Sequence, residues 1–154
     1  MRKNINELLN QLEEKIPYFE SKNEKISSAN VAWHIEHSLL VIIKICEAVS
    51  ASNPDKYKWK FSFWRLLVWL TGSLPRGRAE APPVVIPGNA SDVLSLKKSF
   101  DQARQSLNTL KGCHHNQYFF HPIFGKVKRS DTFDFFAIHT NHHLKIIKDI
   151  LSNK

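Results

Sequence analysis

The sequence has little that would place it in a secreted or membrane-spanning class of protein. It contains only two cysteines, Cys46 and Cys113, in 154 residues, which is too few for a disulfide framework. Its apolar runs are all shorter than the length that spans a bilayer. The first residues lack the apolar core of a signal peptide. We therefore expect a protein of the reducing cytoplasm.

Acidic residues are also scarce, with 14 against 22 lysines and arginines, which gives a formal net charge of +8. The basic residues are spread along the chain and form no basic tail, and no recognised nucleic-acid-binding motif is present. We therefore expect no nucleic-acid partner, and a bias toward anionic small-molecule ligands. Apolar residues make up 42% of the chain, enough for a core, and the length fits a single domain over residues 1–154.

Strand-like alternation is missing as well, and no stretch predicts a sheet. Helical spacing of apolar residues, with capping residues at the ends, predicts four long helices instead. The second of them is apolar on most sides, so we expect it to be deeply buried. The four predicted helices cover residues 4–16, 30–50, 92–110 and 130–151.

The connections between these helices differ in length. A long connection joins the second and third, with a short helix late in residues 56–70 and a stretch rich in proline and glycine over residues 72–88. Residues 113–129 are expected to form a loop. The sequence therefore predicts an all-α fold, a four-helix bundle with a long crossover between the second and third helices.

Histidines are concentrated in the last predicted helix. On a helical wheel His139 and His143 lie near the centre of the apolar face, and His142 lies toward its edge. Two imidazoles four residues apart can hold one metal ion. Imidazoles without partners in a core are costly, so either a metal ion or hydrogen bonds to buried polar groups must accompany them.

The second predicted helix supplies two candidates for a third ligand. His34 and His37 lie three residues apart, on roughly one side of the helix. The periodicity slightly favours His34 as the more buried of the two, because His37 borders a strip that includes Glu36. The residues alone leave both histidines open as ligands.

Three short motifs in order carry a resemblance to a known family. They are Asn30–His37 (NVAWHIEH), His121–Gly125 (HPIFG) and His139–His143 (HTNHH), and Leu74–Ala79 (LPRGRA) is similar too. In this order and spacing they resemble the DinB-like superfamily of metalloenzymes. The resemblance implies a four-helix bundle that binds a divalent metal through His37, His139 and His143. His34 is then a residue behind the ligands, or an alternate ligand.

A site of three histidines leaves coordination positions open, which suits catalysis, and a bound water or thiol would be acidified there. We expect nickel or zinc, because imidazole is a good ligand for both. The positions between His139 and His143 hold no glutamate, so no built-in base of the zinc-protease kind is present. The candidates for a general base are His142, His34 and Glu36.

Members of the DinB-like superfamily include thiol-dependent transferases and hydrolases. The resemblance therefore implies a metal-dependent transferase or hydrolase that acts on a small-molecule substrate, with a low-molecular-weight thiol as cofactor in the first case. Such thiols carry carboxylates or phosphates, and Arg76 and Arg78 on the crossover are candidates to bind them. The alternative is a helical binding or interaction module without catalysis.

The segment 56–70 holds three of the four tryptophans, interleaved with lysines. That composition suits a membrane surface, but also a cover over one end of the bundle or a homodimer contact. We favour packing, and therefore expect no membrane partner. Elsewhere, Cys113, His114, His115 and His121 lack the spacing of a zinc finger, so a second metal site is disfavoured. His121 is a secondary candidate for a substrate contact.

Overall fold

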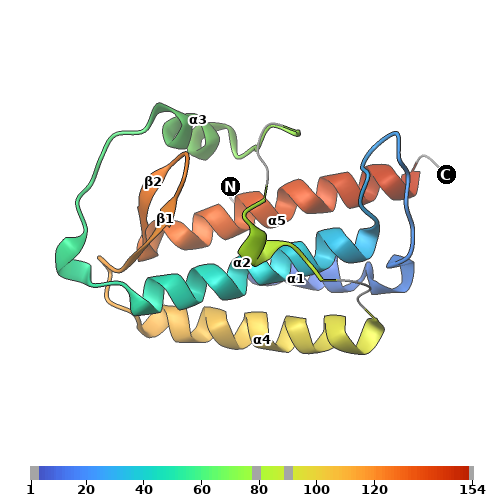
Figure 1. The fold of residues 1–154 in the computed structure, drawn as a ribbon, viewed down its shortest axis with the longest axis horizontal. Helices are drawn as coiled ribbons and strands as arrows, with labels where there is room; N and C mark the ends of the chain where they lie inside the picture. The colour runs from blue at the N-terminus through green and yellow to red at the C-terminus, as the bar shows by residue number, and fades with distance from the viewer. Residues whose placement is uncertain (1–3, 78–80, 89–91, 153–154) are drawn as a thin grey trace.

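The structure is a computed structural model that describes residues 4–77, 81–88 and 92–152, and most of these residues are helical (Figure 1). Two short strands form a hairpin between the last two helices, and three short 3-10 helices (η) lie in the connections. In chain order the elements are α1 (Ile5–Glu13), η1 (Ile16–Tyr18), α2 (Val31–Ala51), η2 (Pro54–Lys56), α3 (Phe63–Thr71), η3 (Pro83–Val85), α4 (Val93–Gly112), β1 (Tyr118–His121), β2 (Gly125–Lys128) and α5 (Arg129–Ser152).

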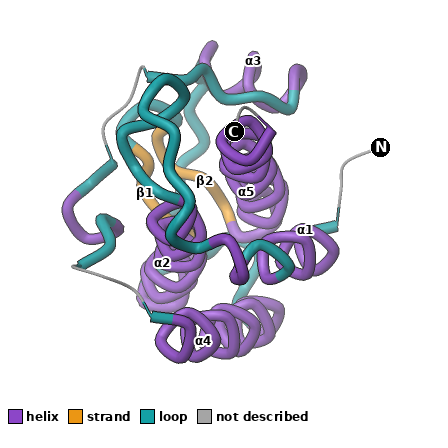
Figure 2. The backbone as a smooth tube through the Cα atoms, turned by 90° about the vertical axis from the view of Figure 1, so that its right-hand side faces the viewer, coloured by secondary structure: helices purple, strands orange, loops and turns teal. Residues whose placement is uncertain are grey.

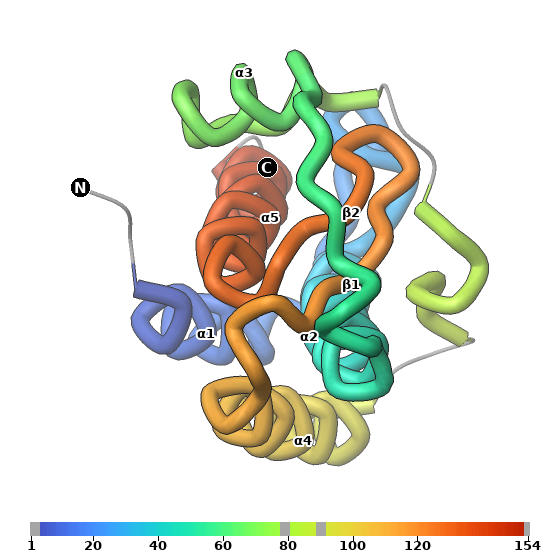
Figure 3. Tube along the Cα trace, turned by 90° about the vertical axis from the view of Figure 1, so that its left-hand side faces the viewer, coloured from blue at the N-terminus to red at the C-terminus, as the bar shows by residue number. Residues whose placement is uncertain are grey.

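Four of the helices share one hydrophobic core. α2 packs against both α4 and α5, and α1 packs against α5 and α4. The two end-on views show these helices around a common interior, with α3 outside them (Figure 2, Figure 3). Phe100 on α4 and Phe136 on α5 are fully buried in this core. Burying a side chain of that size contributes about 1.5–3 kcal/mol, so this shared core holds the helices together.

The start of α2 is fixed by its N-cap. The side-chain oxygen of Asn30 accepts a hydrogen bond of 2.9 Å from the backbone N–H of Trp33, which satisfies one of the donors that open a helix. The helix then runs for 21 residues and buries side chains on most of its surface, as expected for a helix that is apolar nearly all round. This cap places His34 and His37 in the first two turns, next to α5.

The prediction of a loop over residues 113–129, in a fold without a sheet, is wrong. β1 and β2 pair antiparallel, with Phe119 opposite Val127 and His121 opposite Gly125. Phe119 and Val127 are buried against the helices, so the hairpin adds to the core. Each strand has only four residues, which is too short for an alternating pattern to be recognised in the sequence.

The prediction of a mainly helical fold is confirmed. The described residues contain five α-helices, of which α1 and α3 have nine residues each. The connection between α2 and α4 contains α3, which is the short helix expected late in residues 56–70. Across the described part of the chain, no helix is both long and apolar enough to cross a membrane. The four-helix bundle with a crossover stays a prediction.

Candidate metal centre

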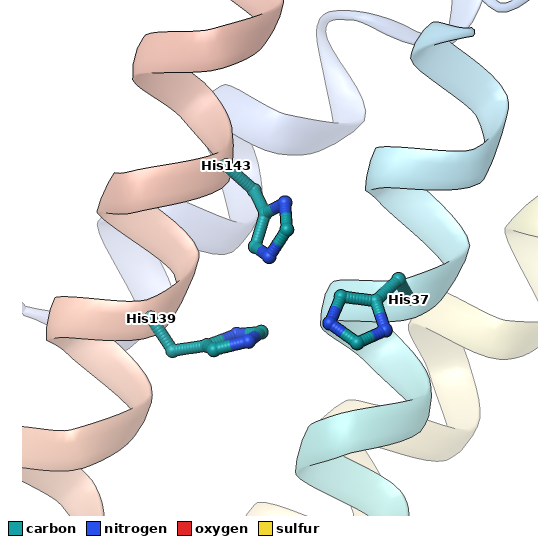
Figure 4. A group of neighbouring side chains, drawn as sticks. All are labelled: His37, His139 and His143. Carbon is teal, nitrogen blue, oxygen red and sulfur yellow. The ribbon is translucent and has the colours of Figure 1, made fainter. Parts of the chain in front are cut away.

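Three histidine rings from two helices converge inside the core (Figure 4). His37 comes from α2, and His139 and His143 come from successive turns of α5. One ring nitrogen from each residue lies within 4.8 Å of the other two, so the group could hold a metal ion. The ring centres are 4.6 Å apart for His139 and His143, and 4.8 Å apart for His37 and His143. The structure thus brings together the three residues that the family resemblance implies.

The three imidazoles are neutral at physiological pH because burial disfavours their charged form. Burial, with the neighbouring histidines adding to it, holds the pKa of His139 and of His143 well below 6.5. The pKa of His37 is also lowered by burial, an effect partly offset by its hydrogen bond to Val85. A metal ligand must be the neutral imidazole, so these environments prepare the rings for coordination. His139 is the most accessible of the three.

Hydrogen bonds determine which nitrogen of His37 is available. Its Nδ1–H donates to the backbone carbonyl of Val85 over 2.8 Å. A carbonyl oxygen can only accept, so Nδ1 carries the proton and Nε2 carries the lone pair. A hydrogen bond from the ring nitrogen that does not bind the metal orients a metal-binding histidine and raises the basicity of its other nitrogen. Val85 belongs to the connection between α2 and α4, so that connection helps to hold the site.

His143 and His139 have different polar surroundings. The Nδ1 atoms of His143 and His34 lie 3.0 Å apart, and Nε2 of His34 lies 3.0 Å from the Ser27 hydroxyl. Nδ1 of His143 is therefore in contact with His34, and its Nε2 is available to a ligand. No hydrogen bond joins the His139 ring to another of the described residues, so both of its nitrogens are unpartnered there.

This donor set fits a divalent metal ion. Three neutral nitrogens, each backed by burial or by a hydrogen bond on the opposite side of its ring, match the histidine sites that hold zinc. Nitrogens held about 2.0–2.1 Å from one ion lie at most about 4 Å apart, so small rotations of the side chains bring the rings to binding distance. Of the described residues, no carboxylate belongs to the group.

Trp33 is a further part of this site that the sequence did not reveal. Its ring stacks on that of His37 with the centroids 4.8 Å apart and the planes at 13°, and it meets His34 edge-on at 5.3 Å. The four-residue spacing between Trp33 and His37 is a signal that could have identified this contact. Ser27 and the Val85 carbonyl had no such signal, because both lie in connections whose course depends on the folded chain.

The candidate general bases lie around the group and not in it. The ring of His142 is perpendicular to that of His143, with the ring centres 5.2 Å apart. Burial lowers the pKa of His142, and a hydrogen bond to the Leu74 backbone opposes this shift. His34 lies behind His143, and burial, with the nearby His37, lowers its pKa to about 4. Glu36 is partly buried, and burial raises its pKa.

The two arginines proposed for cofactor binding have different outcomes. The Arg76 guanidinium donates a hydrogen bond of 2.7 Å to the Asp149 carboxylate, in an exposed ion pair. Its charge helps to lower the pKa of His34 and of His142, which places it near one end of the histidine cluster. Arg78 lies outside the described residues.

The residues considered for a second metal site do not converge. The rings of His114 and His115 lie 4.2 Å apart, but the described residues contain no metal-binding group besides the one on α2 and α5. Nδ1 of His121 accepts hydrogen bonds from the backbone N–H groups of Ile123 and Phe124, so this residue closes the hairpin turn. Burial lowers the pKa of His121 to about 4.

Most of the chain matches a known family. The family model described as the DinB superfamily matches residues 1–147. The chain belongs to the DinB superfamily. No curated protein and no solved structure matches the chain. A three-histidine group that could hold a metal ion is in keeping with this DinB superfamily membership, and the assignment of His37, His139 and His143 as its ligands stays a prediction.

Proposed function

We propose that this DinB superfamily protein is a metal-dependent enzyme that acts on a small molecule as a transferase or hydrolase. The observation that carries the proposal is the convergence of ring nitrogens from His37, His139 and His143 within 4.8 Å. Nickel and zinc are the ions we expect, since imidazole suits both. We also infer that α1, α2, α4 and α5 form a four-helix bundle around this site, with residues 52–92 as the crossover.

The chain's own residues prepare the site before any ion binds. The Val85 carbonyl fixes the His37 tautomer, and Trp33 stacks on the same ring. His34 supports His143 from behind. Three protein ligands leave at least one coordination position for a substrate or water, which is the mark of a catalytic site. A divalent ion held there would lower the pKa of a bound water or thiol toward neutrality.

We favour His142 as the proton acceptor among the candidates. Its N–H bonds to the Leu74 backbone, so the other ring nitrogen keeps an accepting lone pair. Both nitrogens of His34 are already engaged, by His143 and by Ser27. Glu36 stays a secondary candidate, because burial raises the pKa of its carboxyl group and a raised pKa makes a carboxylate a stronger base.

A low-molecular-weight thiol is the cofactor we propose for the transferase reaction. Arg76 donates to Asp149 through one nitrogen, which leaves further N–H groups of the guanidinium to bind a carboxylate of such a thiol.

Cys46 and Cys113 are both free thiols, which supports a reducing cytoplasmic location for the protein.

Elemental analysis tests the metal site directly. We expect protein purified without a histidine tag, and then exposed to nickel or zinc and desalted, to hold close to one ion per chain. His139→Ala removes the candidate ligand that has no other described hydrogen-bond partner, so it should lose most of the ion while the far-ultraviolet circular dichroism stays helical. His115→Ala removes an exposed histidine and should leave the metal content unchanged.

Two results would overturn the proposal. One is a native chain that holds no ion after exposure to either metal. The other is His139→Ala protein that binds the ion as tightly as the native chain does, which would place the metal elsewhere. Activity assays with thiol-dependent transferase and hydrolase substrates then separate the two reaction classes.

A further inference from the structure

The segment 59–70 presents most of its apolar side chains to solvent. Trp59, Phe61, Phe63 and Leu70 are 64%, 65%, 60% and 76% exposed. In the same segment only Val68 is buried, and Trp69 packs against Phe124 of the hairpin with ring centres 5.5 Å apart. The packing expected for the whole segment therefore holds for one side of α3 alone. We call the exposed group Trp59, Phe61, Phe63, Trp64, Leu66 and Leu70 the aromatic surface.

This exposure belongs to a well-anchored segment. The Ser62 hydroxyl caps α3 by accepting from the backbone N–H of Arg65, and it donates to the Ile123 carbonyl at the hairpin turn. The Arg65 guanidinium donates to the carbonyls of Lys126 and Lys60 over 3.1 and 2.7 Å. α3 thus lies across the hairpin, outside the other helices (Figure 1, Figure 3). These hydrogen bonds fix the position of the segment on the hairpin, so its exposed aromatic side chains belong to an ordered surface.

The charged residues of the segment itself all have one sign, although Asp131 of α5 lines the same hollow as Trp59 and Phe61. Residues 56–70 contain Lys56, Lys58, Lys60 and Arg65, and no acidic residue. All three lysines are exposed. Tryptophan and phenylalanine enter the boundary between lipid headgroups and acyl chains, and lysines beside them pair with anionic headgroups.

We propose that the aromatic surface docks this protein onto an anionic lipid membrane. The contact is peripheral: α3 has nine residues, so it lies in the interface plane and does not cross the bilayer. The aromatic and leucine side chains bury themselves at the headgroup boundary, and the lysines reach the phosphates. This role is independent of the metal site.

The same positive charge argues against a second copy of the chain as the partner that covers the aromatic surface. A two-fold symmetric dimer pairs a surface with itself, so Lys56, Lys58 and Lys60 would approach the same three lysines of the partner. The segment has no acidic residue, and the neighbouring Asp131 is a single negative charge beside four positive ones, so a net repulsion would remain. A lipid surface covers the apolar side chains and neutralises the lysines together.

Co-sedimentation of the full chain with lipid vesicles tests the proposal. We expect binding to vesicles of phosphatidylcholine and phosphatidylglycerol in equal amounts, and much weaker binding to phosphatidylcholine alone. Binding should weaken in about 1 M salt, where the Debye length falls to about 3 Å. Trp59→Ser/Phe61→Ser should weaken partitioning by at least about tenfold, because each of these side chains loses its transfer into the interface. Both residues are exposed, so the core stays intact.

Leu94→Ser is the matched control, because Leu94 on α4 is also 64% exposed but lies outside the aromatic surface. This variant should bind as the native chain does. Lys58→Glu/Lys60→Glu should lose the preference for anionic vesicles. The proposal is overturned if the native chain stays in the supernatant with both kinds of vesicle, or if Leu94→Ser weakens binding as much as the double aromatic variant. A native dimer that Trp59→Ser/Phe61→Ser turns into a monomer, with no vesicle binding, overturns it in favour of a second copy.

Discussion

The Nδ1 atoms of His34 and His143 lie 3.0 Å apart, and this contact connects a candidate metal ligand to a line of polar groups that ends at Ser27. When His143 uses Nε2 as a ligand, its Nδ1 carries the proton and donates to His34. His34 then carries its own proton on Nε2 and donates to the Ser27 hydroxyl. The tautomer of His143 is therefore coupled to that of His34, which is not a member of the three-histidine group.

Replacing His34 should weaken metal binding without removing it. Loss of an outer partner of a metal-binding histidine typically costs about 10–100-fold in affinity, so we expect a decrease of that size for His34→Leu. His34→Asn should retain most of the affinity, because the Asn Oδ1 can accept from His143 where Nδ1 of His34 did. Competition with a chelator measures both dissociation constants. Equal losses in the two variants would show that His34 contributes packing alone.

The sequence predicted the helices well because their signals are local. The apolar spacing on α2 and the four-residue spacing of His139 and His143 both act within one or two helical turns. The two candidate ligands on α5 followed from that spacing. The choice of His37 over His34 did not, since the periodicity of a helix buried on most sides favours neither residue strongly, and the family resemblance was needed.

The features that the sequence did not reveal depend on contacts far apart in the chain. Val85 reaches His37 across 48 positions, from a connection whose composition predicts only the absence of regular structure. The hairpin strands are stabilised by packing of Phe119 and Val127 against the helices, and four residues carry too little pattern to show this. The outward orientation of Trp59 and Phe61 depends on Arg65 and on the hairpin beneath it.

The turn of the hairpin makes a prediction about stability. Gly125 has a φ of +70°, which side chains with a Cβ rarely adopt, and a Cβ built there meets nothing within 4 Å. Gly125→Ala should therefore lower the free energy of unfolding by about 1–2 kcal/mol through the backbone alone. Gly112→Ala also meets open space, but lies at the end of α4 without a positive φ.

Gly112→Ala should accordingly be neutral or should stabilise the protein by up to about 1 kcal/mol, since alanine has the higher helix propensity. Urea unfolding of the two variants beside the native chain measures both changes. A loss of the same size in each variant would contradict the explanation, because only one of the two positions has a left-handed backbone.

Protonation of the buried His121 ring should make the protein less stable in acid. Its pKa is about 4 in the folded chain and 6.5 in the unfolded chain, because burial disfavours the charged ring. Between these two values the unfolded state binds more protons, so the free energy of unfolding falls as the pH drops below 6.5 and the loss is complete below about 4. After allowance for partial exposure of the ring, we expect His121 to account for about 2 kcal/mol of that loss.

His121→Asn isolates this contribution. The Asn Oδ1 can accept from the Ile123 and Phe124 N–H groups as Nδ1 of His121 does, so the turn is kept while the titrating ring is removed. Metal-free native and variant proteins are unfolded in urea at neutral pH and near pH 4, with His115→Asn as the control for an exposed imidazole. The difference between the two pH values should be smaller in His121→Asn by about 2 kcal/mol. An unchanged difference would mean that His121 is protonated in the folded chain.

Arg76 and Arg104 are a matched pair for the electrostatics of the site. Each guanidinium donates over 2.7 Å to a carboxylate in a partly exposed ion pair, Arg76 to Asp149 and Arg104 to Glu13. Pairs of this kind contribute about 0–1 kcal/mol, so Arg76→Ala and Arg104→Ala should both change the free energy of unfolding by less than about 1 kcal/mol. Stability alone therefore does not distinguish the two arginines.

Titration of the histidines does distinguish them. Arg76 is one cause of the low pKa of His34 and of His142, after burial in both cases, because a nearby positive charge disfavours protonation of the ring. In metal-free Arg76→Ala protein the pKa of both histidines should rise, while Arg104→Ala should leave them unchanged. Nuclear magnetic resonance of the ring protons across a pH titration measures the pKa of His34 and of His142 in each variant. If neither histidine responds to the loss of Arg76, this arginine is too far from the cluster to bind a thiol cofactor beside the metal, and the part of the function that we assign to it fails.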